Sequence, residues 1–247
     1  EPVARDSLEA GNVQLPPNLF AHNVATRAAQ SLHAQDAAAT GVLGRMLEVV
    51  GEQPGSLSTG AFSIDGNAKI IEAESVVPDV LSARSGAVRF QATREDDEFS
   101  KQVDDVLRPT SESAFGETIA SLTASALDRS EKLGAALDFK LNGFANDKIS
   151  RQFEQVAKLI NVSEDLHTER GAYFVNIGGF DTHSNNGIAM QENFAEINAA
   201  LRSFVTEMRS QGLWEDVVVV SLSEFGRTIT SNGLGTDHGW GGNHFVL

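Results

Sequence analysis

Hydrophobic side chains recur at steps of three and four residues along positions 194–208, a spacing that places them on one face of an α-helix. These residues are Phe194, Ile197, Leu201, Phe204, Val205 and Met208. Largely apolar runs flank this helix, at residues 173–177 and 217–220. Such runs are typical of strands that are buried on both faces of a parallel sheet. The pattern therefore predicts a strand, a helix and a parallel strand, joined by a right-handed crossover.

The earlier part of the chain is predicted to be mostly helical. Further helices are expected at residues 23–36, 42–50, 95–107, 117–136 and 148–160. Alanine favours the first of them, and Gly51 and Pro109 end the second and the third. Residues 1–17 are polar and close with two prolines, so an extended lead-in is expected there.

Short β-like segments lie between these helices, separated by turn residues. They cover residues 61–64, 69–71 and 87–90. We interpret them as an excursion from the main sheet, which makes residues 52–115 an insertion or a lid-like region within a single domain of residues 1–247. The expected fold class is α/β, with a mainly parallel sheet sandwiched by helices.

Both ends of the sequence look incomplete. The chain opens with Glu1 and closes within an apolar run at residues 245–247. A targeting segment and a further strand are therefore expected to lie outside the sequence shown.

The charge balance argues against two classes of partner. The 19 basic and 34 acidic side chains give a net charge of −15. Nucleic acids and anionic membranes both require a basic face, so neither is an expected partner, and no apolar run is long enough to span a membrane. The chain has no cysteine, so any metal ion would have to be bound by oxygen and nitrogen atoms.

The first of three polar clusters follows the predicted strand at residues 173–177. Asp181 and His183 lie two positions apart, and in an extended segment such residues point the same way. They could therefore share one ligand. Taken alone, the pair is also compatible with a loop-capping aspartate and a surface histidine.

The second cluster follows the valine run at residues 217–220. Glu224 is a candidate metal ligand or general base, and Arg227 is a candidate clamp for an anionic group such as phosphate or sulfate. The alternative is an ion pair between these two side chains, which are three residues apart.

The third cluster contains Asp237 and His238 within a glycine-rich loop, where a flexible loop with an incidental histidine is the plain alternative. In an open α/β sheet, the loops at the carboxyl ends of the strands converge on one crevice. We therefore expect the three clusters to form one divalent-metal site, with His22 as a possible further contributor. His167 lies in a polar segment at a helix end and is expected to be solvated.

The clusters together carry a family resemblance. The segments Gly-Gly-Phe-Asp-Thr-His-Ser-Asn, Ser-Glu-Phe-Gly-Arg-Thr and Gly-Thr-Asp-His-Gly-Trp-Gly follow one another in this order in residues 178–241. With Asn-Leu-Phe-Ala-His-Asn at residues 18–23, they resemble the bacterial family known as domain of unknown function 1501. Residues 52–165 carry little of the resemblance.

The resemblance implies a core related to alkaline phosphatases and sulfatases, in an exported protein. It implies metal ligation by Asp181, His183 and His238. At the place of the second metal that superfamily has an Asp-His pair, whereas this chain has Glu224 followed by Phe225. The superfamily's nucleophile follows an earlier strand, and no residue of this sequence is assigned to that role.

The resulting expectation is a metal-dependent hydrolase acting on a small anionic substrate, a phosphate or sulfate ester. Asp181, His183, Asp237 and His238 would bind a divalent ion such as zinc, manganese or calcium. Glu224 would be a ligand or a base, and Arg227 would hold the anion. The alternative is a non-catalytic exported protein that keeps the fold and binds a structural cation or a ligand.

Overall fold

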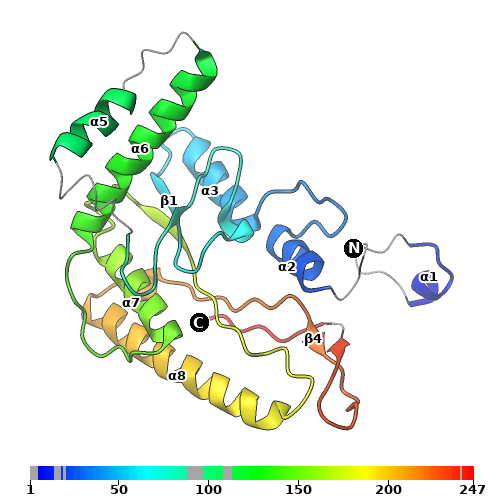
Figure 1. The fold of residues 1–247 in the computed structure, drawn as a ribbon. Coiled ribbons are helices and arrows are strands. Elements are labelled where there is room, and N and C mark those ends of the chain that lie inside the picture. The colour runs from blue at the N-terminus through cyan, green and yellow to red at the C-terminus, as the bar shows by residue number, and fades with distance from the viewer. Residues whose placement is uncertain (1–4, 14–17, 19–20, 88–96, 108–112, 240) are drawn as a thin grey trace.

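The computed structural model describes residues 5–13, 18, 21–87, 97–107, 113–239 and 241–247, and shows a mixed α/β fold with a small parallel sheet (Figure 1). The helices are α1 (Arg5–Glu9), α2 (His22–Ser31), α3 (Val42–Glu52), α5 (Asp97–Leu107), α6 (Ala114–Ala136), α7 (Lys148–Asn161) and α8 (Asn186–Ser210). The strands are β1 (Thr59–Ser63), β2 (Asp79–Val80), β3 (Arg170–Phe174), β4 (Gly226–Arg227) and β5 (His238–Gly239). Short 3₁₀ turns are η1 (Lys69–Ile71) and η2 (Trp214–Asp216).

Strands β2, β1 and β3 are hydrogen-bonded in this order, and both pairings are parallel. Ala61 stands opposite Ala172 and Phe62 opposite Tyr173, and the last two rings stack with centroids 5.5 Å apart. Strand β1 is thus the centre of this sheet. The interpretation of residues 61–64 as an excursion from the sheet is therefore wrong. The pairing partner β3 lies more than a hundred residues further along the chain, so no local pattern indicates this pairing.

Helices cover both faces of the sheet. Phe62 and Ile64 of the β1 segment pack into a core with Phe153 of α7 and Phe204 of α8, whereas Ala61 packs with Leu47 of α3 on the other face. This division follows from the alternation of side chains along a strand. Helices α7 and α8 lie side by side, and the rings of Phe153 and Phe204 are 5.1 Å apart.

The second strand of the predicted strand–helix–strand unit is not formed. Among residues 217–220, only Val220 takes part in a β-bridge, an isolated antiparallel one to Val246. Val217 and Val219 pack against the core, but Val218 and Val220 are 72% and 62% exposed. The segment is extended, and only one of its faces is covered by other residues. A run of four valines predicts burial of both faces, so the exposure of one face could not be predicted from it.

Two other local predictions differ from the structure. Residues 69–71 form the 3₁₀ turn η1 instead of a strand, closed by a hydrogen bond from the Glu72 N–H to the Lys69 carbonyl. Residues 5–9 form helix α1 instead of an extended lead-in. Of the third β-like segment, residues 88–90 lie outside the described part of the chain.

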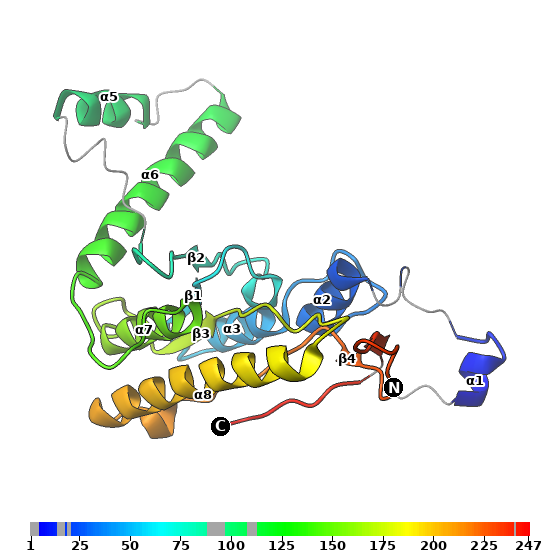
Figure 2. The same cartoon turned by 60° about the horizontal axis from the view of Figure 1, so that its bottom comes forward.

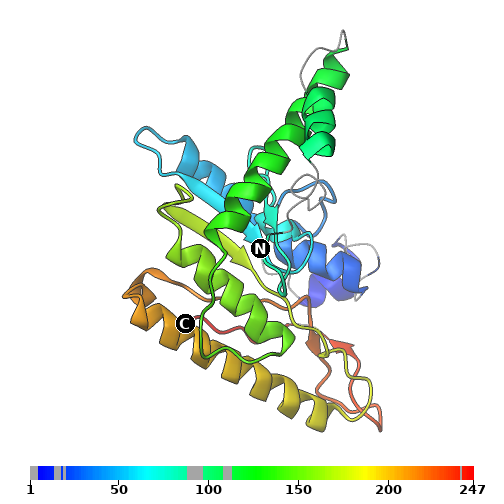
Figure 3. The same ribbon diagram turned by 60° about the vertical axis from the view of Figure 1, so that its left-hand side comes forward.

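The helix predictions are confirmed to within a few residues for α3, α6 and α7, and α8 contains the predicted stretch 194–208 but begins earlier, at Asn186. Helix α5 begins at Asp97 in the described residues, since positions 95 and 96 lie outside them. Helix α2 stops at Ser31 instead of residue 36, because Leu32 takes the left-handed conformation, with φ of 58°, that ends a helix. Figures 2 and 3 show α6 extending away from the body of the molecule, with α5 packed along its far half. None of the described helices combines the length and the apolar character needed to cross a membrane.

Candidate metal centre

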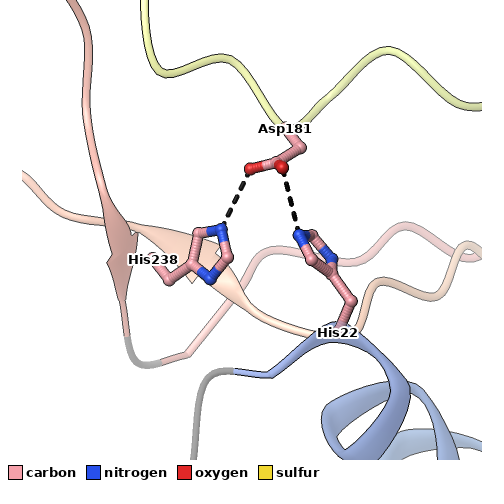
Figure 4. Close-up of side chains that lie close together, drawn as sticks. All are labelled: His22, Asp181 and His238. Atoms are coloured by element: carbon pink, nitrogen blue, oxygen red, sulfur yellow. Dashed lines mark hydrogen bonds and ion pairs between the residues drawn. The ribbon is translucent and has the colours of Figure 1, made fainter.

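Three distant parts of the chain meet beyond the carboxyl end of β3. They are the loop that follows β3, the antiparallel pair β4–β5 and the first turn of α2 (Figures 1 and 4). The loop carries Asp181, the strand pair carries Arg227 and His238, and α2 begins with His22. The meeting point agrees with the general location of ligand sites in open parallel sheets.

The carboxylate of Asp181 lies between two imidazole rings (Figure 4). Its Oδ2 is 3.1 Å from Nε2 of His22, and its Oδ1 is 3.0 Å from Nε2 of His238. One ligand atom from each of the three side chains lies within 4.8 Å of the other two. Among the described residues, this is the group whose geometry could hold a metal ion.

Arg227 and Glu224 contact this group from two sides. Nη1 of Arg227 donates to Oδ1 of Asp181 over 2.6 Å, and Nη2 donates to the carbonyl oxygen of Thr236. Oε1 of Glu224 lies 2.9 Å from Nδ1 of His22, the ring nitrogen that faces away from Asp181. The Arg227 side chain is 19% exposed, so its guanidinium is partly shielded from water.

His183 and Asp237 lie at the edge of the same cluster. Nε2 of His183 is 3.1 Å from Oδ1 of Asp181, and its Nδ1 is 3.4 Å from Oδ1 of Asp237. Asn232 donates to that same Asp237 oxygen over 3.0 Å. These two side chains therefore adjoin the His22–Asp181–His238 group without being members of it.

Close backbone approach at two glycines brings these segments together. In the β4–β5 pair, Arg227 stands opposite His238, and a Cβ on Gly239 would lie 2.9 Å from the Arg227 carbonyl carbon. A Cβ on Gly235 would lie 2.5 Å from the carbonyl oxygen of His183. Only glycine allows such contacts at these two positions. The His238 ring also packs on Phe225, at 4.1 Å between centroids.

The electrostatics of the cluster favour a charged carboxylate and a basic imidazole. Burial alone would raise the pKa of Asp181, but hydrogen bonds from His238, Arg227 and His22 outweigh it and lower this pKa to about 2. The hydrogen bond to Glu224 raises the pKa of His22 above 6.5, and the Asp181 contact adds to this effect. The hydrogen bond from Asn232, followed by that from His183, lowers the pKa of Asp237.

The donor set fits a divalent transition metal. Two imidazole nitrogens and one carboxylate are a common protein ligand set for zinc, and they also suit manganese. Calcium prefers about six to eight oxygen ligands, so this set argues against calcium. The contact from Glu224 to the outer nitrogen of His22 is of the kind that orients metal-bound histidines in proteins.

Comparison with known families gives a match over nearly the whole chain. The model of the family described as Protein of unknown function (DUF1501) matches residues 2–247. The chain belongs to the DUF1501 family. Neither the curated proteins nor the solved structures contain a significant match to it.

All six side chains that the sequence singled out in this DUF1501 chain lie in one cluster. They are Asp181, His183, Glu224, Arg227, Asp237 and His238. His22, weighed only as a further contributor, proves central to the group. The sequence indicated a role for His22 only through its position in residues 18–23, a segment that carries part of the family resemblance. His167 follows α7 and precedes β3, so it lies at the opposite end of that strand.

Proposed function

We propose that this protein is a metal-dependent hydrolase of phosphate or sulfate esters. The observation that carries the proposal is the Asp181 carboxylate, which contacts two imidazoles and a guanidinium at once. A cation site and an anion-binding group are thereby adjacent. Hydrolysis of a charged ester needs this combination, because the substrate is an anion that must be neutralised while its bond to the leaving group breaks.

His22, Asp181 and His238 would hold the metal ion, which would supply Lewis-acid polarisation of the ester. Glu224 would keep the His22 ring oriented by accepting a hydrogen bond from Nδ1. This assigns Glu224 a positioning role, which the sequence had left open between ligand and base. With His183, Asp237 would extend the network on the other side of Asp181.

Arg227 would bind the ester anion. A guanidinium presents a planar fork of donors that matches two oxygens of a phosphate or sulfate, and partial burial strengthens the interaction. An open depression of about 620 Å³ adjoins this side chain, lined also by Asp237 and His238. The depression offers space for an ester group next to the proposed metal ligands.

The proposal includes the finer fold relationship. We infer a core related to alkaline phosphatases and sulfatases, and an exported location, from the order of the motifs in residues 178–241. The placement of the cluster after a parallel strand supports this inference.

The decisive experiment measures metal content before activity. Natively purified protein is examined by elemental analysis, alongside His22→Ala, Asp181→Asn and His238→Ala. His167→Asn is the control, because His167 has a positive φ of 51° that asparagine tolerates. We expect stoichiometric zinc or manganese in the wild type and the control, and its loss in the three site variants.

Hydrolysis of 4-nitrophenyl phosphate and 4-nitrophenyl sulfate by the metal-loaded protein then tests the reaction. Activity that disappears with the metal and in Asp181→Asn supports the proposal. A metal-free wild type would overturn the metal centre. A stoichiometric metal without hydrolysis of any ester would favour the non-catalytic cation-binding alternative.

A further inference from the structure

A second open depression, of about 590 Å³, lies on the α2 side of the metal group. His22 lines it and also belongs to the His22–Asp181–His238 group, so the depression and the proposed centre share a side chain. Its other lining residues include Asn23, Thr26 and Arg27 from α2, and Asn67 and Lys69 from the segment after β1. The depression therefore adjoins the proposed centre at His22.

One face of α2 and a hydrogen bond between α2 and η1 shape this depression. Residues 22, 23, 26, 27 and 30 recur at three- and four-residue steps and share one face of α2. The Oε1 atom of Gln30 accepts a hydrogen bond from the Ile70 backbone over 3.1 Å. This bond ties α2 to η1, and it places Lys69 and the α2 face around the same space.

The depression carries positive charge although the chain has a net charge of −15. Arg27 and Lys69 line it and none of the described lining residues is acidic, although Asp181 and Glu224 contact His22 at its edge. Within the described part of the chain, Arg27 has no carboxylate partner. Lys69 lies 3.7 Å from Glu72, but the two side chains are 33% and 39% exposed, and such surface pairs are weak. Both cations are therefore available to a bound anion.

The remaining lining groups suit hydroxyl groups. The side-chain amides of Asn23 and Asn67 and the hydroxyl of Thr26 both donate and accept hydrogen bonds. An apolar leaving group would leave these polar atoms without partners and would gain little. A polyol would match them, because each hydroxyl of such a molecule is also both a donor and an acceptor.

We propose that this depression binds the alcohol portion of the substrate, and that this portion is a polyol with a second anionic group. The inference rests on the proposed hydrolase function. Arg227 holds the ester group to be cleaved, whereas Arg27 and Lys69 hold the second anion on the far side of His22. The depression thus selects doubly anionic substrates over singly anionic ones.

Equilibrium binding tests this with two probes that differ by one phosphate, glucose 1-phosphate and glucose 1,6-bisphosphate. Titration calorimetry is carried out on the protein as purified and after treatment with a chelator, which prevents turnover. We expect the bisphosphate to bind at least about tenfold more tightly, the equivalent of one or two charged hydrogen bonds. The double variant Arg27→Gln/Lys69→Gln should lose this preference and keep the affinity for the monophosphate.

Arg202→Gln is the matched control, since Arg202 is an exposed arginine on α8 away from the depression. Unfolding curves of all variants establish that they are folded. Equal affinity for the two probes, or a preference that survives the double variant, would overturn the inference. These outcomes are independent of metal content and nitrophenyl-ester hydrolysis, so the inference and the proposed function can fail separately.

Discussion

Arg227 donates a hydrogen bond from Nη1 to Oδ1 of Asp181 across 2.6 Å, although the two residues are 46 positions apart. The same oxygen lies 3.0 Å from Nε2 of His238. A guanidinium and an imidazole therefore share one carboxylate oxygen. In a metal-loaded protein the Asp181 carboxylate would bind the cation, and Arg227 would be free to turn its donors to an anion.

We expect Arg227→Gln to separate metal binding from anion binding. The variant removes a positive charge beside the metal ligands, so its affinity for zinc should equal or exceed that of the wild type. Inhibition by inorganic phosphate should weaken at least about tenfold, because the charged donors are lost. Calorimetry with zinc, followed by phosphate inhibition of ester hydrolysis, measures both effects.

Arg227→Lys provides the comparison, since lysine retains the charge but lacks the planar fork. It should bind phosphate with intermediate affinity. If Arg227→Gln lost its metal, Arg227 would instead be needed to hold Asp181 in place, and its role as anion clamp would be wrong.

The buried side chain of Gln152 supports the loop that carries Asp181. Its Nε2 donates to the Asn176 carbonyl and its Oε1 accepts from the Asn176 N–H, each over 2.7 Å. Gln152→Met removes both of these bonds, which should lower the free energy of unfolding by about 1–3 kcal/mol. Urea denaturation followed by circular dichroism measures this change.

Gln155→Met is a matched control on the same helix. Gln155 is 5% exposed, and its Oε1 has no hydrogen-bond partner among the described residues. Its replacement should therefore change stability by less than about 1 kcal/mol. Equal destabilisation by the two substitutions would mean that loss of volume or shape, and not the bonds to Asn176, dominates at Gln152.

Gly235→Ala should disturb the candidate centre through the backbone. The new Cβ would lie 2.5 Å from the carbonyl oxygen of His183, so the loops of Asp181 and Asp237 would have to separate. We expect a loss of about 1–3 kcal/mol of stability, together with weaker zinc binding. Thermal unfolding and zinc titration test the two effects.

The control for this substitution is Gly187→Ala. A Cβ at this exposed position in the first turn of α8 meets no atom within 4 Å. Alanine should stabilise the helix there by about 0.5–1 kcal/mol. A Gly235→Ala variant as stable as Gly187→Ala would show that the two loops can move apart freely.

The amino terminus of α7 should make stability depend on pH in acid. Oδ1 of Asp147 accepts a hydrogen bond from the Ser150 N–H over 2.7 Å. Burial raises the pKa of Asp147, but this hydrogen bond and others outweigh it, and the pKa falls below its ordinary 3.8. The charged form therefore stabilises the fold above the unfolded-state pKa, and the contribution disappears as the pH falls through the lower folded-state value.

Asp147→Ala should accordingly lose about 1 kcal/mol of stability at pH 7, and this deficit should narrow below about pH 4. Asp147→Asn keeps a capping side chain without the charge, so its stability should stay close to that of the wild type. Removal of the charge also lowers the repulsion on nearby Glu196, whose pKa is raised by burial and by Asp147. Guanidinium denaturation across this pH range gives the comparison, and a constant deficit for Asp147→Ala would contradict the ionic contribution.

The sequence predicted the long helices well because their signal is local. In α8, Phe204 and Met208 have the four-residue spacing of one helical face, and both are fully buried against α7. The six candidate side chains were also found from sequence, since polar residues after apolar runs converge at one end of a parallel sheet. Asp181 follows a strand of the parallel sheet as expected, whereas Arg227 reaches it from the separate antiparallel pair β4–β5.

The sequence by itself thus determined the positions of the long helices and the side chains of the candidate site. Only the tertiary structure decided that β1 is the central strand, that Val218 and Val220 face outward, and that His22 joins Asp181 and His238 in the candidate metal group. The physical reason is the same in each case. Each of these features depends on contacts between residues far apart in the chain: the order of the strands, the burial of one face of residues 217–220, and the approach of α2 to Asp181. No local sequence pattern encodes such contacts.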